Sequence, residues 1–205
     1  VIGNGENIYM SLENLYVANT QYDYNWYGHN RGSTEKTNVY RFALTGDGID
    51  LKAQGSVPGR ILNQFSMDEH ENHFRIATTK GNMWDEENPS TNNLYVLDQE
   101  MNTVGSLEGI APGERIYSTR FLGDRTYMVT FKKVDPFFVI DTSNPRQPLI
   151  LGKLKLPGYS DYLHPYDENH VIGFGKDTTE SKDGDFAWYQ GMKIAVFDVR
   201  DVSSP

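Results

Sequence analysis

Three tryptophans are the residues of this 205-residue chain best suited to bind a ligand. Each lies in a polar stretch that also holds tyrosine or acidic residues, at 21–37, 81–93 and 178–190. Aromatic rings offer flat apolar surface for stacking, and carboxylates accept hydrogen bonds from hydroxyl or amide groups. We therefore predict a glycan or a peptide (protein) ligand, bound by Trp26, Trp84, Trp188, Tyr24, Tyr27 and Tyr189.

Each tryptophan also has a purely structural alternative, in which its ring folds back onto the edge of its own sheet. Burial of the ring would then stabilise the fold by about 1.5–3 kcal/mol. The sequence leaves both roles open for each of the three residues.

A second polar group, the run DEHENH at residues 68–73, contains residue types that bind metal ions. It falls at a predicted turn between two strands, where the other repeats also carry polar residues, so a solvated hairpin is the favoured interpretation. The stretch Asp183-Gly184-Asp185 matches only part of a calcium loop and lacks the closing glutamate. We therefore predict no metal site and no cofactor.

Catalytic motifs are absent: the sequence contains no G-x-S-x-G, H-E-x-x-H, P-loop or dinucleotide fingerprint. The predicted inner strands carry mainly neutral polar residues, namely Asn63, Gln64, Ser118, Thr119 and Ser160. This favours a non-catalytic binding scaffold. The alternative is a hydrolase or lyase with a site at the mouth of a central channel, built on Asp161, His164, Glu69 or loop carboxylates.

Composition excludes several other classes of protein. The net charge of −9 makes the chain a poor partner for nucleic acid or for an anionic membrane surface. No stretch of 18 apolar residues is present, so no membrane-spanning helix is predicted. The absence of cysteine excludes disulfides and thiol chemistry.

The elements that position the tryptophans are short strands, seen most plainly in residues 112–154. Four runs rich in β-branched and aromatic residues are separated by Gly, Pro, Asn and Asp: 116–121, 126–131, 137–141 and 149–154. We expect Gly123-Asp124 to form a tight hairpin turn with a positive φ angle. Four antiparallel strands of this length make one blade of a β-propeller.

Repetition extends this pattern over the whole chain. Pro-Gly pairs recur at Pro58-Gly59, Pro112-Gly113 and Pro157-Gly158, which are 54 and 45 residues apart. Such a period is typical of propellers. We predict one β-propeller segment over residues 1–205, with blades at 7–57, 60–107, 114–154 and 159–205. Residues 61–67 are predicted to be the continuous first strand of the second blade.

Two segments, FFVIDTSNP at 137–145 and LPGYSDYLHPYDENH at 156–170, are more distinctive than a general strand pattern. With them the whole chain resembles a bacterial and archaeal family of secreted proteins that carry a C-terminal β-propeller domain distantly related to WD repeats. The resemblance implies an exported, extracellular or cell-surface protein and a ring of more than four blades. It supplies no catalytic residues.

The direction of the strands predicts where the tryptophans lie. The three tryptophan-containing stretches, 21–37, 81–93 and 178–190, are insertion loops that join the second and third strands of their blades. The three tryptophans are therefore expected on one face of the array. The last blade lacks a predicted fourth strand, and we interpret the chain as part of a larger ring. Uncovered sheet faces at both flanks predict that the fragment associates with itself.

Overall fold

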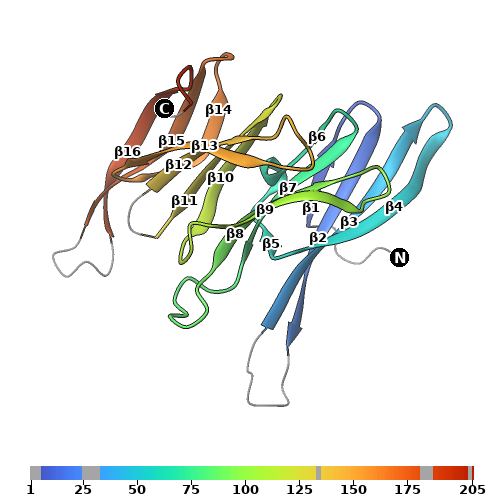
Figure 1. The fold of residues 1–205 in the computed structure, drawn as a ribbon, viewed down its shortest axis with the longest axis horizontal. Helices are drawn as coiled ribbons and strands as arrows, with labels where there is room; N and C mark the ends of the chain where they lie inside the picture. The colour runs from blue at the N-terminus through green and yellow to red at the C-terminus, as the bar shows by residue number, and fades with distance from the viewer. Residues whose placement is uncertain (1–5, 25–32, 133–134, 181–186, 203–204) are drawn as a thin grey trace.

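The computed structural model describes residues 6–24, 33–132, 135–180, 187–202 and 205. Within these residues, four antiparallel sheets follow one another along the chain (Figure 1). We name these sheets blade one to blade four in chain order. The expected all-β fold of the propeller type is confirmed.

Blades one and three each have four strands in sequential order, with the first strand at one edge of the sheet. Blade one consists of β1 (Asn7–Met10), β2 (Asn14–Tyr24), β3 (Ser33–Thr45) and β4 (Gly48–Pro58). Blade three consists of β10 (Arg115–Leu122), β11 (Arg125–Phe131), β12 (Asp135–Asp141) and β13 (Leu149–Leu156). The four strands predicted for residues 112–154 are therefore present.

Blades two and four depart from this plan. Blade two consists of β5 (Arg60–Ile61), the 3-10 helix η1 (Gln64–Ser66), β6 (Met67–His70), β7 (His73–Lys80), β8 (Thr91–Leu97) and β9 (Thr103–Ile110). Blade four has three described strands, β14 (Tyr159–Pro165), β15 (His170–Glu180) and β16 (Ala187–Asp198).

The first strand of blade two corrects the prediction of one continuous strand over residues 61–67. The Asn63 side chain accepts a hydrogen bond of 2.9 Å from the backbone N–H of Phe65, which starts the 3-10 turn. This local bond competes with pairing to β7. The first strand is therefore split into β5 and β6, both of which pair with β7.

The apolar core lies between neighbouring blades. At matching positions of the third strands, Val39 packs toward blade two, Leu94 toward blade three and Phe137 toward blade four. Alternating residues of the same strands pack toward the preceding blade, as Tyr95 and Phe138 do. Because successive side chains in a strand point to opposite faces, each inner blade is apolar on both faces.

Tight turns join the first and second strands of the blades. Gly123 has a φ of 53°, which confirms the expected positive φ in the turn between β10 and β11. In the turn between β6 and β7, Glu71 and Asn72 both have positive φ, at 47° and 61°. These angles suit a two-residue hairpin loop, so residues 68–73 form the expected hairpin.

A buried polar link ties blade two to blade three near these turns. Arg75 pairs with Asp68 and donates hydrogen bonds to the Gly123 carbonyl oxygen at 2.6 Å and to Thr142 Oγ1 at 2.9 Å. The Arg75 guanidinium also lies 5.1 Å from the centre of the Phe121 ring. Removing one partner of such a buried pair typically costs about 3–5 kcal/mol.

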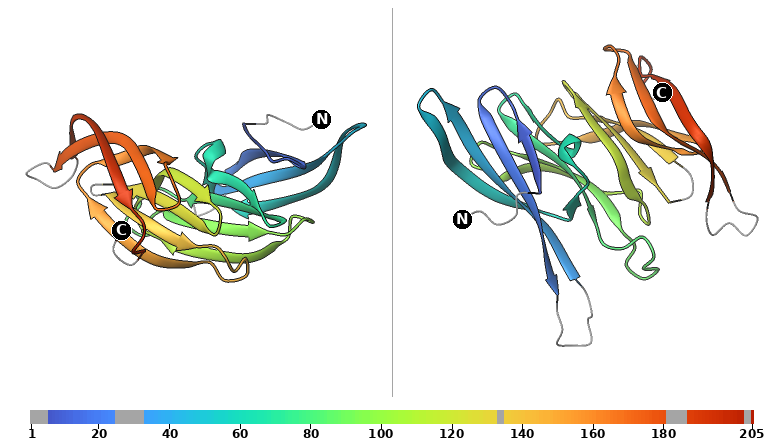
Figure 2. Two further views of the ribbon diagram at one scale, coloured as in Figure 1. Left: turned by 90° about the horizontal axis from the view of Figure 1, so that it is seen from above. Right: turned by 180° about the vertical axis from the view of Figure 1, so that it is seen from behind.

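Viewed from above, the four sheets form an open arc, with blade one at one end and blade four at the other (Figure 2). The first strands of adjacent blades approach one another, as β10 and β14 do. Among the described residues, no helix has the length and hydrophobicity to cross a bilayer.

Gly59 holds the chain where blade one passes into blade two. Its φ is 90°, and a Cβ atom here would lie 2.8 Å from the Thr79 carbonyl oxygen and 2.9 Å from Thr78 Oγ1. Only glycine adopts this conformation without strain, and it also allows the two backbones to approach closely.

We predict that Gly59→Ala lowers the free energy of unfolding by about 1–3 kcal/mol, because both the backbone angle and the new contacts are unfavourable. Gly46→Ala is the matched control, since a Cβ atom at Gly46 meets nothing within 4 Å. Urea denaturation of both variants measures the difference. Equal stability of the two variants would contradict this role of Gly59.

Candidate functional site

One end of the array carries the connections between second and third strands, and we call it the insertion face. Figure 1 shows the segment between β7 and β8 on the same side as the far ends of the β2–β3 and β15–β16 pairs. The strand direction deduced from the sequence is therefore correct.

The tryptophan stretches differ from the loops expected. β2 continues to Tyr24 and β3 begins at Ser33, while β15 continues to Glu180 and β16 begins at Ala187. Much of the insertions at 21–37 and 178–190 is therefore an extension of a hairpin, because alternating Thr, Tyr and charged residues suit paired strands.

The predicted binding residues are placed as follows. Trp84 lies in the segment between β7 and β8, on the insertion face, and Trp188 lies within β16, paired with Thr179. The backbones of Tyr24 and Tyr189 lie in β2 and β16. Trp26, Tyr27 and the Asp183-Gly184-Asp185 stretch lie outside the described residues.

The segment from Gly81 to Ser90 is held by its own hydrogen bonds. Asn82 uses its side chain to accept from Trp84 N–H at 3.0 Å and its carbonyl oxygen to accept from Ser90 N–H at 3.1 Å. Asp85 Oδ1 accepts hydrogen bonds from the N–H groups of Glu87 and Asn88, at 3.1 and 2.9 Å. The loop is thereby given a defined shape.

Blade three contributes a lysine that supports Trp84. Lys132, the residue directly after β11, places Nζ 5.1 Å from the centre of the Trp84 ring and donates a 2.8 Å hydrogen bond to the Met83 carbonyl oxygen. The Trp84 side chain nevertheless remains 65% exposed. Its ring is therefore supported by a cation and still largely open to solvent.

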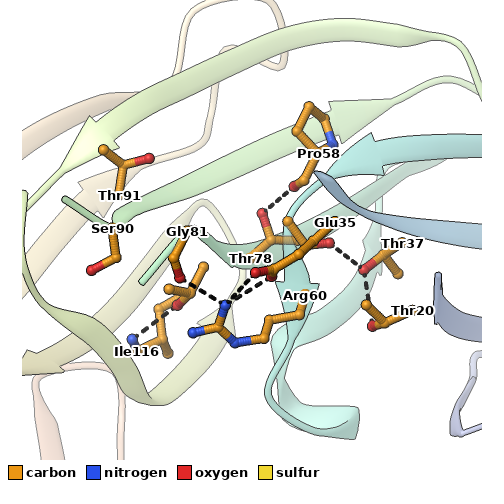
Figure 3. A network of polar contacts seen from close by, with 12 residues as sticks. Thr20, Glu35, Thr37, Pro58, Arg60, Thr78, Gly81, Ser90, Thr91 and Ile116 are labelled. Carbon is orange, nitrogen blue, oxygen red and sulfur yellow. Dashed lines mark hydrogen bonds and ion pairs between the residues drawn. The ribbon is translucent and has the colours of Figure 1, made fainter. Parts of the chain in front are cut away.

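A polar network fixes the start of the same loop, at Gly81, to blade one (Figure 3). Arg60 Nη1 lies 2.7 and 3.0 Å from the Glu35 carboxylate oxygens and donates to the Gly81 carbonyl oxygen at 2.9 Å. The Glu35 backbone oxygen accepts from Gly59 N–H at 2.8 Å. Blade one, the transition at Gly59 and the Trp84 loop are thus joined through one ion pair.

Beside this network, the first strands of blades two, three and four border a pocket of about 380 Å³. Its lining residues are Arg60, Ile61, Leu62, Thr79, Arg115, Ile116, Tyr117 and Asp161. Burial raises the pKa of the Asp161 carboxyl, and Lys176 opposes part of that effect. We call this space the channel-mouth pocket, because β5, β10 and β14 all begin there.

The three residues of the hydrolase or lyase alternative have different neighbours. Asp161 borders the channel-mouth pocket, whereas His164, nearer the far end of β14, contacts Tyr162 at 3.4 Å. Glu69 accepts hydrogen bonds from Ser11 at 2.5 Å and Asn14 Nδ2 at 2.9 Å, linking blades two and one. These contacts do not assemble the three residues into one constellation.

The DEHENH run also has structural partners. Asp68 pairs with buried Arg75, and His70 Nε2 lies 3.2 Å from Asp124 Oδ1 in the next blade. Within the part of the chain that the structure describes, His, Asp and Glu side chains form no group of three or more that could hold a metal ion.

Arg120, on β10, contacts both neighbouring blades. Its Nε donates a 2.9 Å hydrogen bond to the Leu163 carbonyl oxygen of blade four. Its guanidinium lies 4.2 Å from the Phe65 ring centre and 5.1 Å from that of Tyr162. Burial lowers the pKa of Arg120, with Tyr162 opposing the effect.

Sequence reasoning missed Arg60, Arg115 and Lys132 as parts of the insertion face. A signal was present for two of them, because Arg60 and Arg115 each follow closely after a Pro-Gly pair. Lys132 lies beside the short connection of blade three, but nothing in the sequence indicates that it reaches the loop of another blade.

We predict that Glu35→Gln lowers the free energy of unfolding by about 1.5–3 kcal/mol, because Arg60 loses a charged acceptor. Asp50→Asn is the control, since the Lys52–Asp50 pair is exposed and 3.4 Å long, and exposed pairs contribute less than about 1 kcal/mol. Urea denaturation compares the two. A larger loss in the Asp50 variant would refute the importance of the Glu35–Arg60 pair.

Comparison with known proteins identifies the fold family. A family model described as a β-propeller domain matches residues 1–205. An uncharacterized protein of Methanocaldococcus jannaschii is 46% identical over 171 residues, which is 83% of this chain and 25% of the relative. An uncharacterized protein of Archaeoglobus fulgidus is 44% identical over 171 residues, or 83% and 24% of the two chains.

The chain thus spans about a quarter of the length of these relatives. Both relatives are archaeal, and their names say nothing of secretion or WD repeats, so that part of the resemblance stays a prediction. The match over all 205 residues and the four-sheet architecture agree. The chain belongs to the β-propeller domain family.

Proposed function

We propose that the protein is a non-catalytic, exported scaffold that binds a glycan or an extended peptide on its insertion face. The observation that carries this proposal is the exposure of Trp84. This residue is 65% exposed although its loop is fixed by hydrogen bonds and by Lys132. An exposed aromatic ring on a preorganised loop loses little conformational entropy on binding.

The channel-mouth pocket extends the proposed surface. Arg60 connects the Trp84 loop to the pocket through its hydrogen bond to Gly81, and Arg115 adds a second cation to the pocket wall. Both ligand classes carry groups that accept hydrogen bonds from arginine, such as sugar hydroxyls and peptide carbonyls. A ligand stacked on Trp84 would therefore find polar partners in the pocket.

Export rests on the family resemblance alone. The proposed location, extracellular or at the cell surface, agrees with a glycan or peptide ligand. Fractionation of the source cells, with the protein detected by antibody, tests this part of the proposal separately from binding.

The hydrolase or lyase alternative retains one supporting observation, the raised pKa of Asp161 at the wall of the pocket. A perturbed carboxyl in a pocket is a general indication of acid–base chemistry. Incubation of any ligand found by binding, followed by mass spectrometry, separates the two functions: an unchanged ligand supports the scaffold, and cleavage supports the enzyme.

Glycan and peptide arrays provide the first test, followed by calorimetry on the best ligand. We predict that Trp84→Ala weakens binding about 30-fold, the effect of losing an interaction of about 2 kcal/mol. Trp84→Phe should retain part of the affinity, because a smaller ring remains.

Tyr166→Ala is the matched control for this measurement. Tyr166 is also an exposed aromatic residue but lies in the turn after β14, at the end of the array opposite the insertion face. Binding unaffected by Trp84→Ala, or weakened equally by both substitutions, would disprove the proposed role of the insertion face.

A further inference from the structure

The channel-mouth pocket carries more cations than carboxylates, although the chain as a whole has a net charge of −9. Its charged lining residues are two arginines, Arg60 and Arg115, and one carboxylate, Asp161. All of its lining residues belong to blades two, three and four. The pocket is therefore formed by blades that pack on one another within the described chain.

The two arginines are brought together through Thr79. Arg60 is paired with Thr79 in the ladder between β5 and β7. Thr79 Oγ1 accepts a hydrogen bond of 3.1 Å from the backbone N–H of Ile116, the residue after Arg115. Figure 3 shows Ile116 beside Arg60. Arginines from two different blades therefore border one space of about 380 Å³.

Arg60 keeps hydrogen-bond donors for a ligand. Its contacts with Glu35 and Gly81 all use one terminal nitrogen, Nη1. Nε and Nη2 make no hydrogen bond to the residues that the structure describes, and Figure 3 shows both nitrogens turned away from Glu35. The ion pair with Glu35 thus holds Arg60 in place and leaves N–H groups available.

Arg115 is held by an aromatic ring. Its Nη2 donates a 3.0 Å hydrogen bond to the Tyr117 hydroxyl, and its guanidinium carbon lies 4.8 Å from the centre of the Tyr117 ring. That ring is itself packed against Phe131 and Tyr159, with centres 5.3 and 4.7 Å away. Among the described residues, no carboxylate forms an ion pair with Arg115. Its charge is therefore oriented in advance and not neutralised by these residues.

The neighbouring carboxylates do not cancel the two cations. Glu114 precedes Arg115 in the sequence but accepts a hydrogen bond from the Thr130 hydroxyl in β11. Partial burial raises the pKa of Asp161, an effect that Lys176 opposes. Burial thus disfavours the charged form of the one carboxylate in the lining.

We propose that the channel-mouth pocket binds the carboxylate of a uronic acid, so that the ligand of the insertion face is an acidic glycan. This inference rests on the proposed function and narrows its ligand class. The two guanidinium groups would donate charge-assisted hydrogen bonds to the carboxylate, whose two oxygens match the fork of an arginine. Asp161 would accept hydrogen bonds from the sugar hydroxyls.

A uronic acid fits these groups better than an acidic peptide does. One sugar ring carries both a carboxylate for the arginines and hydroxyl donors for Asp161, whereas ionised acidic side chains carry only acceptors. The Trp84 loop is joined to the pocket by the hydrogen bond from Arg60 to Gly81. The exposed Trp84 ring would therefore offer a stacking surface to a neighbouring sugar of the same glycan.

A glycan array in which each uronate oligosaccharide stands beside its methyl ester tests the ligand class, with acidic peptides on the same array. The ester keeps the sugar ring and removes the charge. We expect the acid to bind about 10-fold or more tightly than its ester. Equal binding of acid and ester would overturn the carboxylate inference and leave the proposed glycan scaffold intact. Binding of acidic peptides in preference to every uronate would overturn the assignment to a glycan.

Calorimetry with the best uronate ligand locates the carboxylate. Arg115→Gln should weaken binding of the acid about 10- to 100-fold, because charge-assisted hydrogen bonds are lost, and should affect the ester much less. Arg146→Gln is the matched control, since Arg146 is exposed in the connection between β12 and β13, at the opposite end of the array. Circular dichroism verifies the fold of both variants. Equal losses in the two variants would overturn the site.

Two further variants separate this inference from the proposed function. Asp161→Asn should bind the uronate about fivefold more tightly, because it removes a like charge and keeps an acceptor oxygen. Trp84→Ala should weaken acid and ester alike, because stacking does not depend on the charge. Binding weakened by Trp84→Ala but unchanged by Arg115→Gln would overturn the carboxylate site and still support the scaffold. Weaker binding by the Asp161 variant would also contradict the site.

Discussion

The packing of one apolar sheet face on the next is the interaction on which the rest of the structure depends. One blade of such an array cannot bury its apolar faces alone, and each blade here gains stability from packing on its neighbours. The rings of Tyr16 in blade one and Phe74 in blade two stack with their centres 4.3 Å apart. The rings of Phe137 in blade three and Phe197 in blade four stack with their centres 4.1 Å apart. The arc, the channel-mouth pocket and the spacing of the loops all follow from this repeated contact.

Polar contacts then fix how neighbouring blades are aligned. Arg75 joins blades two and three at one end, and Arg60 joins blade one to the Trp84 loop at the insertion face. Such contacts are directional, whereas apolar packing alone tolerates sliding. Because Lys132 of blade three supports the ring of Trp84 in blade two, the candidate binding surface depends on correct alignment of adjacent blades.

Local patterns in the sequence were sufficient to predict most of the strands, the turn at Gly123 and the shared face of the insertions, because alternation and glycine conformation are properties of short segments. Contacts between blades were not predictable in this way. The Asn63 side chain breaks the first strand of blade two by one local hydrogen bond, and Phe65 then stacks on Arg120 of blade three. Likewise, Glu35 and Arg60 are 25 residues apart, and only the fold brings them together.

Hydrogen–deuterium exchange of the backbone amides, at a concentration where the chain is monomeric, tests the central role of sheet packing most directly. Blades two and three are covered on both faces, so amides in β7, β8, β11 and β12 should exchange slowest, and those in β2, β3, β15 and β16 faster. Equal protection in all four blades, or faster exchange in blades two and three, would contradict the account.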